Sequence, residues 1–159
     1  MRVAVLTISD AGARGERADG SGDAIATWVA ERGYALAERA LVPDDSVEIV
    51  RQLIGWCDRD AADLVLTTGG TGLSPRDNTP EATLAVLDRT ADGIAERLRV
   101  ACIESFPRSA LSRGIAGSRH RTLIVNLPGS TGGVRDALAA LTPIIDHAVT
   151  IVRGDRADH

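Results

Sequence analysis

Short apolar segments that alternate with helical patterns constrain the fold of this chain more than any other feature. Three of them, residues 2–8 (RVAVLTI), 64–68 (LVLTT) and 122–127 (TLIVNL), are rich in β-branched residues and have no polar face. This pattern is typical of strands buried on both faces. A further strand is expected at residues 34–42. Strands alternating with amphipathic helices predict an α/β fold: a three-layer α/β/α single domain, residues 1–159, with a mostly parallel sheet.

Apolar residues at helical spacing predict helices between these strands. We expect helices over residues 23–32 and 91–105, one capped at its start by Ser46, and one with Thr79 as N-cap and Pro80 as its first residue. A C-terminal helical region is expected from residue 132 to about 152, broken or restarted at Pro143.

Two other segments lack a clear pattern. Residues 11–22 contain four glycines and several charges, and they are expected to form a mobile loop. Residues 111–117 fit neither a helix nor a strand clearly.

Composition narrows the class of protein. The net charge of −4 argues against bulk nucleic-acid binding. No apolar run approaches the roughly 20 residues of a membrane span, and residues 1–8 do not resemble a signal peptide, so a cytoplasmic location is expected. Cys57 and Cys102 are expected to be buried and not in a disulfide or a metal site. All 18 basic residues are arginines, which excludes a Walker lysine, a Schiff base and a lysine nucleophile.

Polar or glycine-rich loops follow three of the expected strands. They are Ser9–Asp10, residues 67–77 and residues 126–130. Ligands of such sheets bind outside the carboxyl ends of the strands. The site is therefore predicted at this edge.

The glycine-rich loop begins with the sequence TTGGTG, residues 67–72. Glycine permits positive φ, so successive N–H groups can form an anion-binding nest, to which Thr68 and Thr71 would add donors. A tight strand-to-helix turn without a ligand is the alternative. The segment is neither a Walker loop nor a dinucleotide-binding loop, since it lacks a lysine and has Pro75 where a glycine would be needed.

Arg76 and Asp77 follow, just ahead of the helix expected at Pro80. A helix start and an arginine both attract phosphate. Asp77 makes sense there if Mg²⁺ lies between it and phosphates, or if it holds a polar ring of the substrate. The alternative is a surface Arg–Asp arrangement with an Asx-turn. Asp44 and Asp45, after the second strand, are by themselves more typical of a solvated turn.

These segments together resemble the MogA/MoaB family of molybdenum-cofactor biosynthesis proteins, which includes the N-terminal domain of gephyrin. The matching segments, in family order, are TISD (7–10), VPD (42–44), LTTGGTG (66–72), PRD (75–77), TPEAT (79–83), ES (104–105), LSR (111–113) and LPG (127–129). They cover nearly the whole chain. The run from TTGGTG to TPEAT is highly specific.

The resemblance implies a homotrimer that adenylylates molybdopterin with ATP and Mg²⁺. Asp44 and Asp77 match the two aspartates of the family's active site. We expect Asp44 near the nucleotide phosphates and Mg²⁺, and Asp77 near the pterin. Two alternatives are a MoaB-like paralogue that binds molybdopterin without turnover and a nucleotide-binding module unrelated to molybdopterin.

The remaining site residues come from the loops and from the matched motifs. Some relatives have Asn-Pro where this chain has Ser130–Thr131. This departure affects one predicted site residue, Ser130. A separate molybdenum-insertion protein is a candidate partner. The predicted substrate-binding residues are Ser9, Asp10, Asp19, Thr68, Gly69, Gly70, Thr71, Gly72, Arg76, Thr79, Pro80, Ser105, Asn126, Pro128, Gly129 and Ser130.

Overall fold

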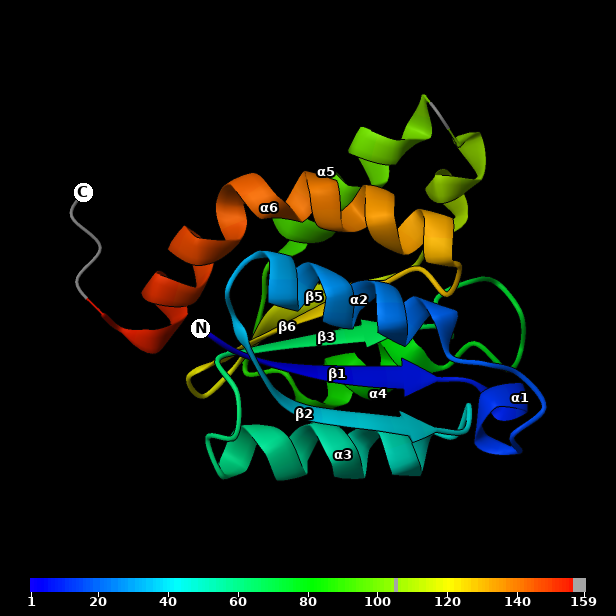
Figure 1. Cartoon of the computed structure of the whole chain (residues 1–159), viewed down its shortest axis with the longest axis horizontal. Helices are drawn as coiled ribbons and strands as arrows, with labels where there is room; N and C mark the ends of the chain where they lie inside the picture. Colours follow the sequence, from blue (N-terminus) through cyan, green and yellow to red (C-terminus); the bar gives the residue numbers. More distant parts are fainter. Residues whose placement is uncertain (105, 156–159) are drawn as a thin grey trace.

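A six-stranded sheet forms the middle layer of the protein in a computed structural model, which describes residues 1–104 and 106–155 (Figure 1). The strands are β1 (Arg2–Ile8), β2 (Ala35–Val42), β3 (Leu64–Thr68), β4 (Arg89–Thr90), β5 (Ala116–Arg119) and β6 (Thr122–Leu127). Their order is β2-β1-β3-β6-β5-β4. Neighbours among β2, β1, β3 and β6 pair in parallel, and β5 is antiparallel to both β6 and β4. The expected α/β fold with a mostly parallel sheet is confirmed.

Helices cover both faces of this sheet. One face carries α2 (Gly20–Glu31), α5 (Asp92–Ile103) and α6 (Thr131–Arg153), and the other carries α3 (Ser46–Asp58) and α4 (Thr79–Val86) (Figure 1). Two short helices, α1 (Asp10–Ala13) and the 3₁₀ helix η1 (Pro107–Leu111), lie in connections.

Strand β1 shows why both faces must be covered. Val3 and Val5 pack in the core under α2 and α6, whereas Ala4, Leu6 and Ile8 pack in the core with α3 and α4. Successive side chains of a strand point to opposite faces. An uninterrupted apolar run therefore requires a helical layer on each side.

Three expectations about helix ends are wrong. Residues 11–22 are not one loop, because α1 extends into them as far as Ala13 and α2 already begins at Gly20. Asp45, not Ser46, caps α3, and its Oδ1 accepts hydrogen bonds from the N–H groups of Val47 and Glu48. A carboxylate one residue earlier reaches both free N–H groups, and Ser46 is left as the first helical residue.

The start of α4 also differs from expectation. Asn78 is the N-cap residue, Thr79 is the first helical residue and Pro80 the second. The Thr79 side chain instead donates a hydrogen bond to the carbonyl of Gly69.

The C-terminal helix α6 runs through Pro143 as one element of 23 residues, so the expected break is absent. The apolar stripe of α6 continues across the proline, with Leu141 and Ile145 both buried in the same core. Even with a helix of this length, none within the described ranges is long and apolar enough to cross a membrane.

Residues 111–117, for which the sequence favours neither a helix nor a strand, contain the end of η1 and the start of β5. Both cysteines are buried and not joined by a disulfide, as expected. Burial raises the pKa of Cys57 to about 11.

Candidate functional site

The four parallel strands end at the same edge of the sheet, and their ends are joined by hydrogen bonds. Ser9 N–H, after β1, donates to the carbonyl of Val42 at the end of β2 (2.9 Å). The Thr68 hydroxyl, at the end of β3, donates to the carbonyl of Pro128 after β6 (2.6 Å). The structure thus brings together the three loops that the sequence placed at this edge.

The backbone of Gly69 and Gly70 lies against the end of β1. Their φ values are +100° and +63°, and a Cβ on Gly69 would lie 2.1 Å from the carbonyl oxygen of Ile8. Thr79 holds this turn from below, since its N–H donates to Gly70 O (3.1 Å) and its hydroxyl to Gly69 O (2.9 Å). Only glycine fits a position with both positive φ and such close approach.

Asn126 joins the same layer from β6. Its side-chain amide donates to the hydroxyls of Thr67 (2.9 Å) and Thr83 (3.0 Å) and accepts from Ile115 N–H (3.2 Å). The Asn126 side chain therefore ties β3, α4 and the segment before β5 together under the site. None of the buried side-chain polar atoms in the described ranges lacks a partner, so this layer is rigidly bonded.

Asp10 and Asp44 hold one another. Asp10 N–H donates to a carboxylate oxygen of Asp44 (2.8 Å), and Asp44 N–H donates to a carboxylate oxygen of Asp10 (3.0 Å). Arg76 pairs with the second oxygen of Asp10 (2.6 Å) and thereby lowers the pKa of Asp10. Burial raises the pKa of Asp44; the Asp10 N–H opposes this, and the charges of Asp10 and Asp77 add to it. Asp44 is thus oriented with one carboxylate oxygen left for a ligand.

Asp77 is held by its own turn. Its N–H donates to Ser74 O (2.9 Å), and one of its carboxylate oxygens accepts from Ser74 N–H (2.9 Å). A Cβ on Gly72 would lie 2.8 Å from this carboxylate. The glycine therefore leaves the space that the Asp77 side chain needs.

Asp19 has a structural role as the N-cap of α2. One carboxylate oxygen accepts from Gly22 N–H (2.9 Å), and the other accepts from the Thr7 hydroxyl and from Arg39 (2.8 Å each). Its partners are all within the protein.

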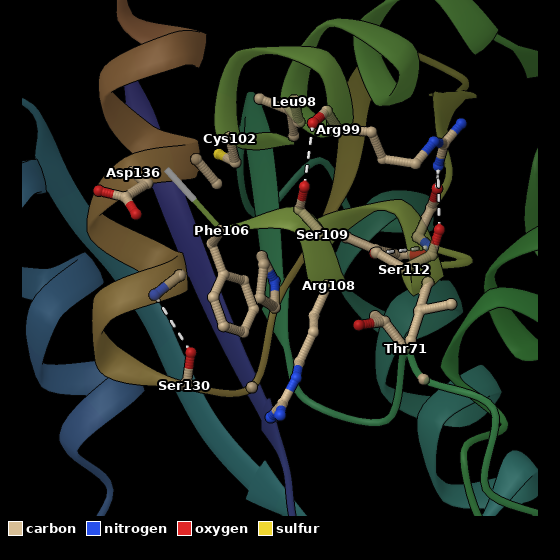
Figure 2. A pocket seen from close by; sticks show the side chains of 18 of the residues that line it. Thr71, Leu98, Arg99, Cys102, Phe106, Arg108, Ser109, Ser112, Ser130 and Asp136 are labelled. Carbon is tan, nitrogen blue, oxygen red and sulfur yellow. Dashed lines mark hydrogen bonds between the residues drawn. The ribbon is translucent and has the colours of Figure 1, made fainter. Parts of the chain in front are cut away.

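Two cavities meet at the strand ends. The larger, about 570 Å³, is lined mainly by polar residues and includes Asp44 and Arg17. The smaller, about 320 Å³, has a more apolar wall that includes Leu98 and Phe106, and Figure 2 shows it at close range. The residues common to both linings are Gly70, Asp77, Gly129 and Ser130.

The cavities contain most of the sequence-predicted residues. Asp10, Thr68, Arg76, Thr79 and Pro80 line neither cavity, and Ser105 lies outside the described residues. The predicted residues that line one cavity or both are Ser9, Asp19, Asp44, Gly69, Gly70, Thr71, Gly72, Asp77, Asn126, Pro128, Gly129 and Ser130.

One wall of the smaller cavity was not predicted from the sequence. It is built from α5 and η1, and Figure 2 shows Phe106 and Arg108 extending from this side toward Ser130. Leu98 and Cys102 have helical spacing that does not distinguish a core-facing side chain from a cavity-facing one. The LSR motif marks only the end of this wall, at Leu111 and Ser112.

The carboxylates of the larger cavity suit Mg²⁺ held jointly with a ligand. Among the residues that the structure describes, no group of three His, Cys, Asp or Glu side chains is arranged to hold a metal alone. Mg²⁺ commonly binds one or two carboxylates together with substrate phosphates. Asp44 and Asp77 both line this cavity, so the donor set fits that mode.

Known proteins share this architecture. The family model described as "Probable molybdopterin binding domain" matches residues 4–147. A molybdopterin adenylyltransferase from Helicobacter pylori is 38% identical over 98% of this chain and 89% of its own. Molybdenum cofactor biosynthesis protein B from Escherichia coli is 39% identical over 86% of this chain and 79% of its own.

Solved structures agree. The molybdopterin biosynthesis enzyme MoaB from Thermus thermophilus has a TM-score of 0.91 and 50% identity, with 96% of each chain covered. A MogA structure has a TM-score of 0.90 and 38% identity, covering 96% of this chain and 99% of its own. The match over residues 4–147 and the agreement in sequence and fold show the family: the chain belongs to the molybdopterin-binding family of molybdenum-cofactor biosynthesis proteins.

Proposed function

We propose that this protein is a molybdopterin adenylyltransferase. The terminal phosphate of molybdopterin attacks the α-phosphorus of ATP, a new P–O bond forms, and the bond from the α-phosphorus to the bridging oxygen breaks. Adenylylated molybdopterin and pyrophosphate are the products. One observation carries the proposal: two cavities of different polarity share a wall that contains Asp77, as a reaction between two bound substrates requires.

We assign the larger, polar cavity to ATP and the smaller, more apolar cavity to the pterin. Asp44 lines only the larger cavity, whereas Asp77 lines both. We therefore assign Asp44 to the nucleotide phosphates and Asp77 to the region where the two substrates would meet. In phosphoryl-type transfer the protein mainly positions the reactants and stabilises charge.

Mg²⁺, bound with ATP, would neutralise phosphate charge and so ease the approach of an anionic nucleophile. Asp44 is our proposed ligand, since Asp10 N–H and the backbone of Asp44 hold its orientation. The Gly69–Gly70 turn adds backbone N–H groups next to this carboxylate. Its positive φ values and the bonds from Thr79 keep that turn in place.

The test combines purified protein with molybdopterin, ATP and Mg²⁺, and measures pyrophosphate and adenylylated pterin. Asp44→Asn is expected to lower the rate by about 100-fold, the effect of removing one electrostatic group at a reacting centre. Asp45→Asn is the matched control, because Asn caps helices as well as Asp and Asp45 does not line either cavity. Full activity of Asp44→Asn would refute the assignment of Asp44.

A second candidate is a paralogue that binds molybdopterin without turnover. Two of the relatives, molybdenum cofactor biosynthesis protein B and MoaB, are not named as adenylyltransferases. Pterin binding without pyrophosphate release in the same assay would support this candidate.

We also propose that the protein acts as a cytoplasmic homotrimer and passes its product to a molybdenum-insertion protein. Size-exclusion chromatography with light scattering measures the molar mass of the protein and so tests the trimer directly. A mass of one or two chains would reject it.

A further inference from the structure

Arg113 contacts both ends of the loop that carries Asp77. It lies between η1 and β5, and its guanidinium donates to the carbonyls of Gly72 (2.7 Å) and Asp77 (2.6 Å). Its backbone N–H donates to Thr71 O (2.8 Å). The guanidinium also pairs with Glu81, in the first turn of α4.

The loop of residues 72–77 depends on these polar contacts. Residues 73–76 are all exposed, and Leu73 is 66% exposed, so no apolar core holds the loop. Its internal bonds join Ser74 to Asp77 and to the backbone of Arg76. Arg76 reaches Asp10 from the exposed side. Arg113 is the residue that bonds both ends of this loop to the body of the protein.

An arginine suits this role better than a lysine. Its planar guanidinium has five N–H donors in a rigid fork, so it can reach two carbonyls and a carboxylate at once. The Arg113 side chain is 33% exposed, and water therefore competes only in part for these bonds.

Arg99 extends the connection to the smaller cavity. From α5, its guanidinium donates to Gly114 O (2.8 Å), next to Arg113, and it also lines that cavity. Figure 2 shows Arg99 directed at the segment that contains Ser112. The missed cavity wall and the Asp77 loop are thus joined through residues 112–114.

We propose that Arg113 is a positioning residue that sets Asp77 at the junction of the two cavities. The inference rests on the proposed adenylyl transfer, in which Asp77 lies where the substrates meet. Arg113 lines neither cavity and acts through the backbone of the loop. Its contact with Glu81 secures the guanidinium; the two carbonyl contacts place Asp77.

A double-mutant cycle tests this role. Arg113→Ala is expected to lower kcat by about 10- to 100-fold, the size of effect that a misplacement of about 1 Å can produce. In an Asp77→Ala background the same change should lower kcat less than about threefold, because residues that act as a unit are not additive. Arg113→Lys, which keeps one or two of the bonds, should fall between the wild type and Arg113→Ala and serves if Arg113→Ala does not fold. Equal losses in both backgrounds would overturn the proposal.

Arg97→Ala is the matched control. Arg97 also donates from its guanidinium to a backbone carbonyl, Ala140 O (2.8 Å), but it joins α5 to α6. It should leave kcat within about twofold of the wild type, since it does not contact the loop. An equal loss of kcat in Arg97→Ala and Arg113→Ala would mean general destabilisation and reject the proposal.

Hydrogen exchange at the amides of Ser74 and Asp77 gives a readout that does not need turnover. Faster exchange in Arg113→Ala but not in Arg97→Ala supports the positioning role, and unchanged exchange overturns it. If the wild type binds its substrates but releases no pyrophosphate, the proposed function fails. The exchange result then still decides whether Arg113 holds the loop.

Discussion

Four arginines make no hydrogen bond or ion pair through their side chains within the described ranges: Arg17, Arg89, Arg108 and Arg135. Two of them, Arg17 and Arg108, line the larger and the smaller cavity respectively. The arginines around them are bound to carboxylates or carbonyls of the protein. A guanidinium without a protein partner at a cavity wall is available to an anionic ligand.

Arg17→Ala is accordingly expected to raise KM for ATP by about fivefold, since an exposed charged contact contributes roughly 1 kcal/mol. The increase should shrink at high salt, which screens exposed charges. Steady-state kinetics at low and high salt measures both effects. Arg89→Ala, an exposed and equally unpaired arginine outside the cavities, is the control. An equal effect of the two substitutions would contradict a specific contact.

The sequence could predict residues with chemistry of their own, but not those that act through contacts. Asp77 was identified because a carboxylate is unusual in a loop suited to phosphate and because it matches a motif, whereas Asp44 was identified only because it matches a motif. Asp19 also matches, yet its carboxylate caps α2 and binds Arg39. Arg113 was noticed only as part of a motif. Its role depends on two carbonyls 36 and 41 residues away, and no local pattern encodes such distances.

Helices and strands could be predicted where the pattern of apolar residues within the element itself determines it. Strands β1, β3 and β6 coincide with their apolar runs. The start of α4 was misplaced because Thr79 bonds the Gly69 carbonyl, a tertiary contact that outweighs its preference for capping. Strands β4 and β5 were missed, since a two-residue strand and the segment AGSR carry no alternation.

Two glycine substitutions test how far tertiary contact determines these elements. Gly69→Ala should lower the free energy of unfolding by at least about 2 kcal/mol, because it combines positive φ with a clash against Ile8 O. Gly55→Ala, within α3, places its Cβ in open space and should raise it by about 1 kcal/mol through helix propensity. Urea unfolding of both variants measures the difference. Similar values for the two would contradict the strain assigned to the Gly69 turn.

At the scale of the whole molecule, Asp63 joins the beginning, middle and end of the chain. It precedes β3, and its carboxylate accepts hydrogen bonds from the Arg2 backbone N–H and guanidinium (2.7 Å each). It also pairs with Arg153, the last residue of α6 (2.7 Å). Burial acts to raise the pKa of Asp63, but the bonds from Arg2 and the charge of Arg153 outweigh it, and the pKa is lowered.

A lowered pKa in the folded state means that folding favours the ionised carboxylate. The stabilisation is therefore complete above the unfolded pKa of about 3.9 and is lost as the pH falls through the lower, folded value. Asp63→Asn should lower the free energy of unfolding by about 3 kcal/mol at pH 7, since it leaves two arginines without a buried partner. The gap to the wild type should narrow between pH 5 and about pH 3, as the wild type loses the same contribution.

Urea unfolding at pH 7, 5, 4 and 3 measures this gap. Asp92→Asn is the control, because Asp92 is exposed at the start of α5 and a surface charge there contributes only a few tenths of a kcal/mol. A gap for Asp63→Asn that stays constant from pH 7 to pH 3 would show that the carboxylate's charge is not what joins the ends of the chain. A gap that narrows would assign part of the protein's acid sensitivity to Asp63, which lies at the end of the sheet opposite the cavities. Acid would then loosen the two chain ends by protonating a group outside the site.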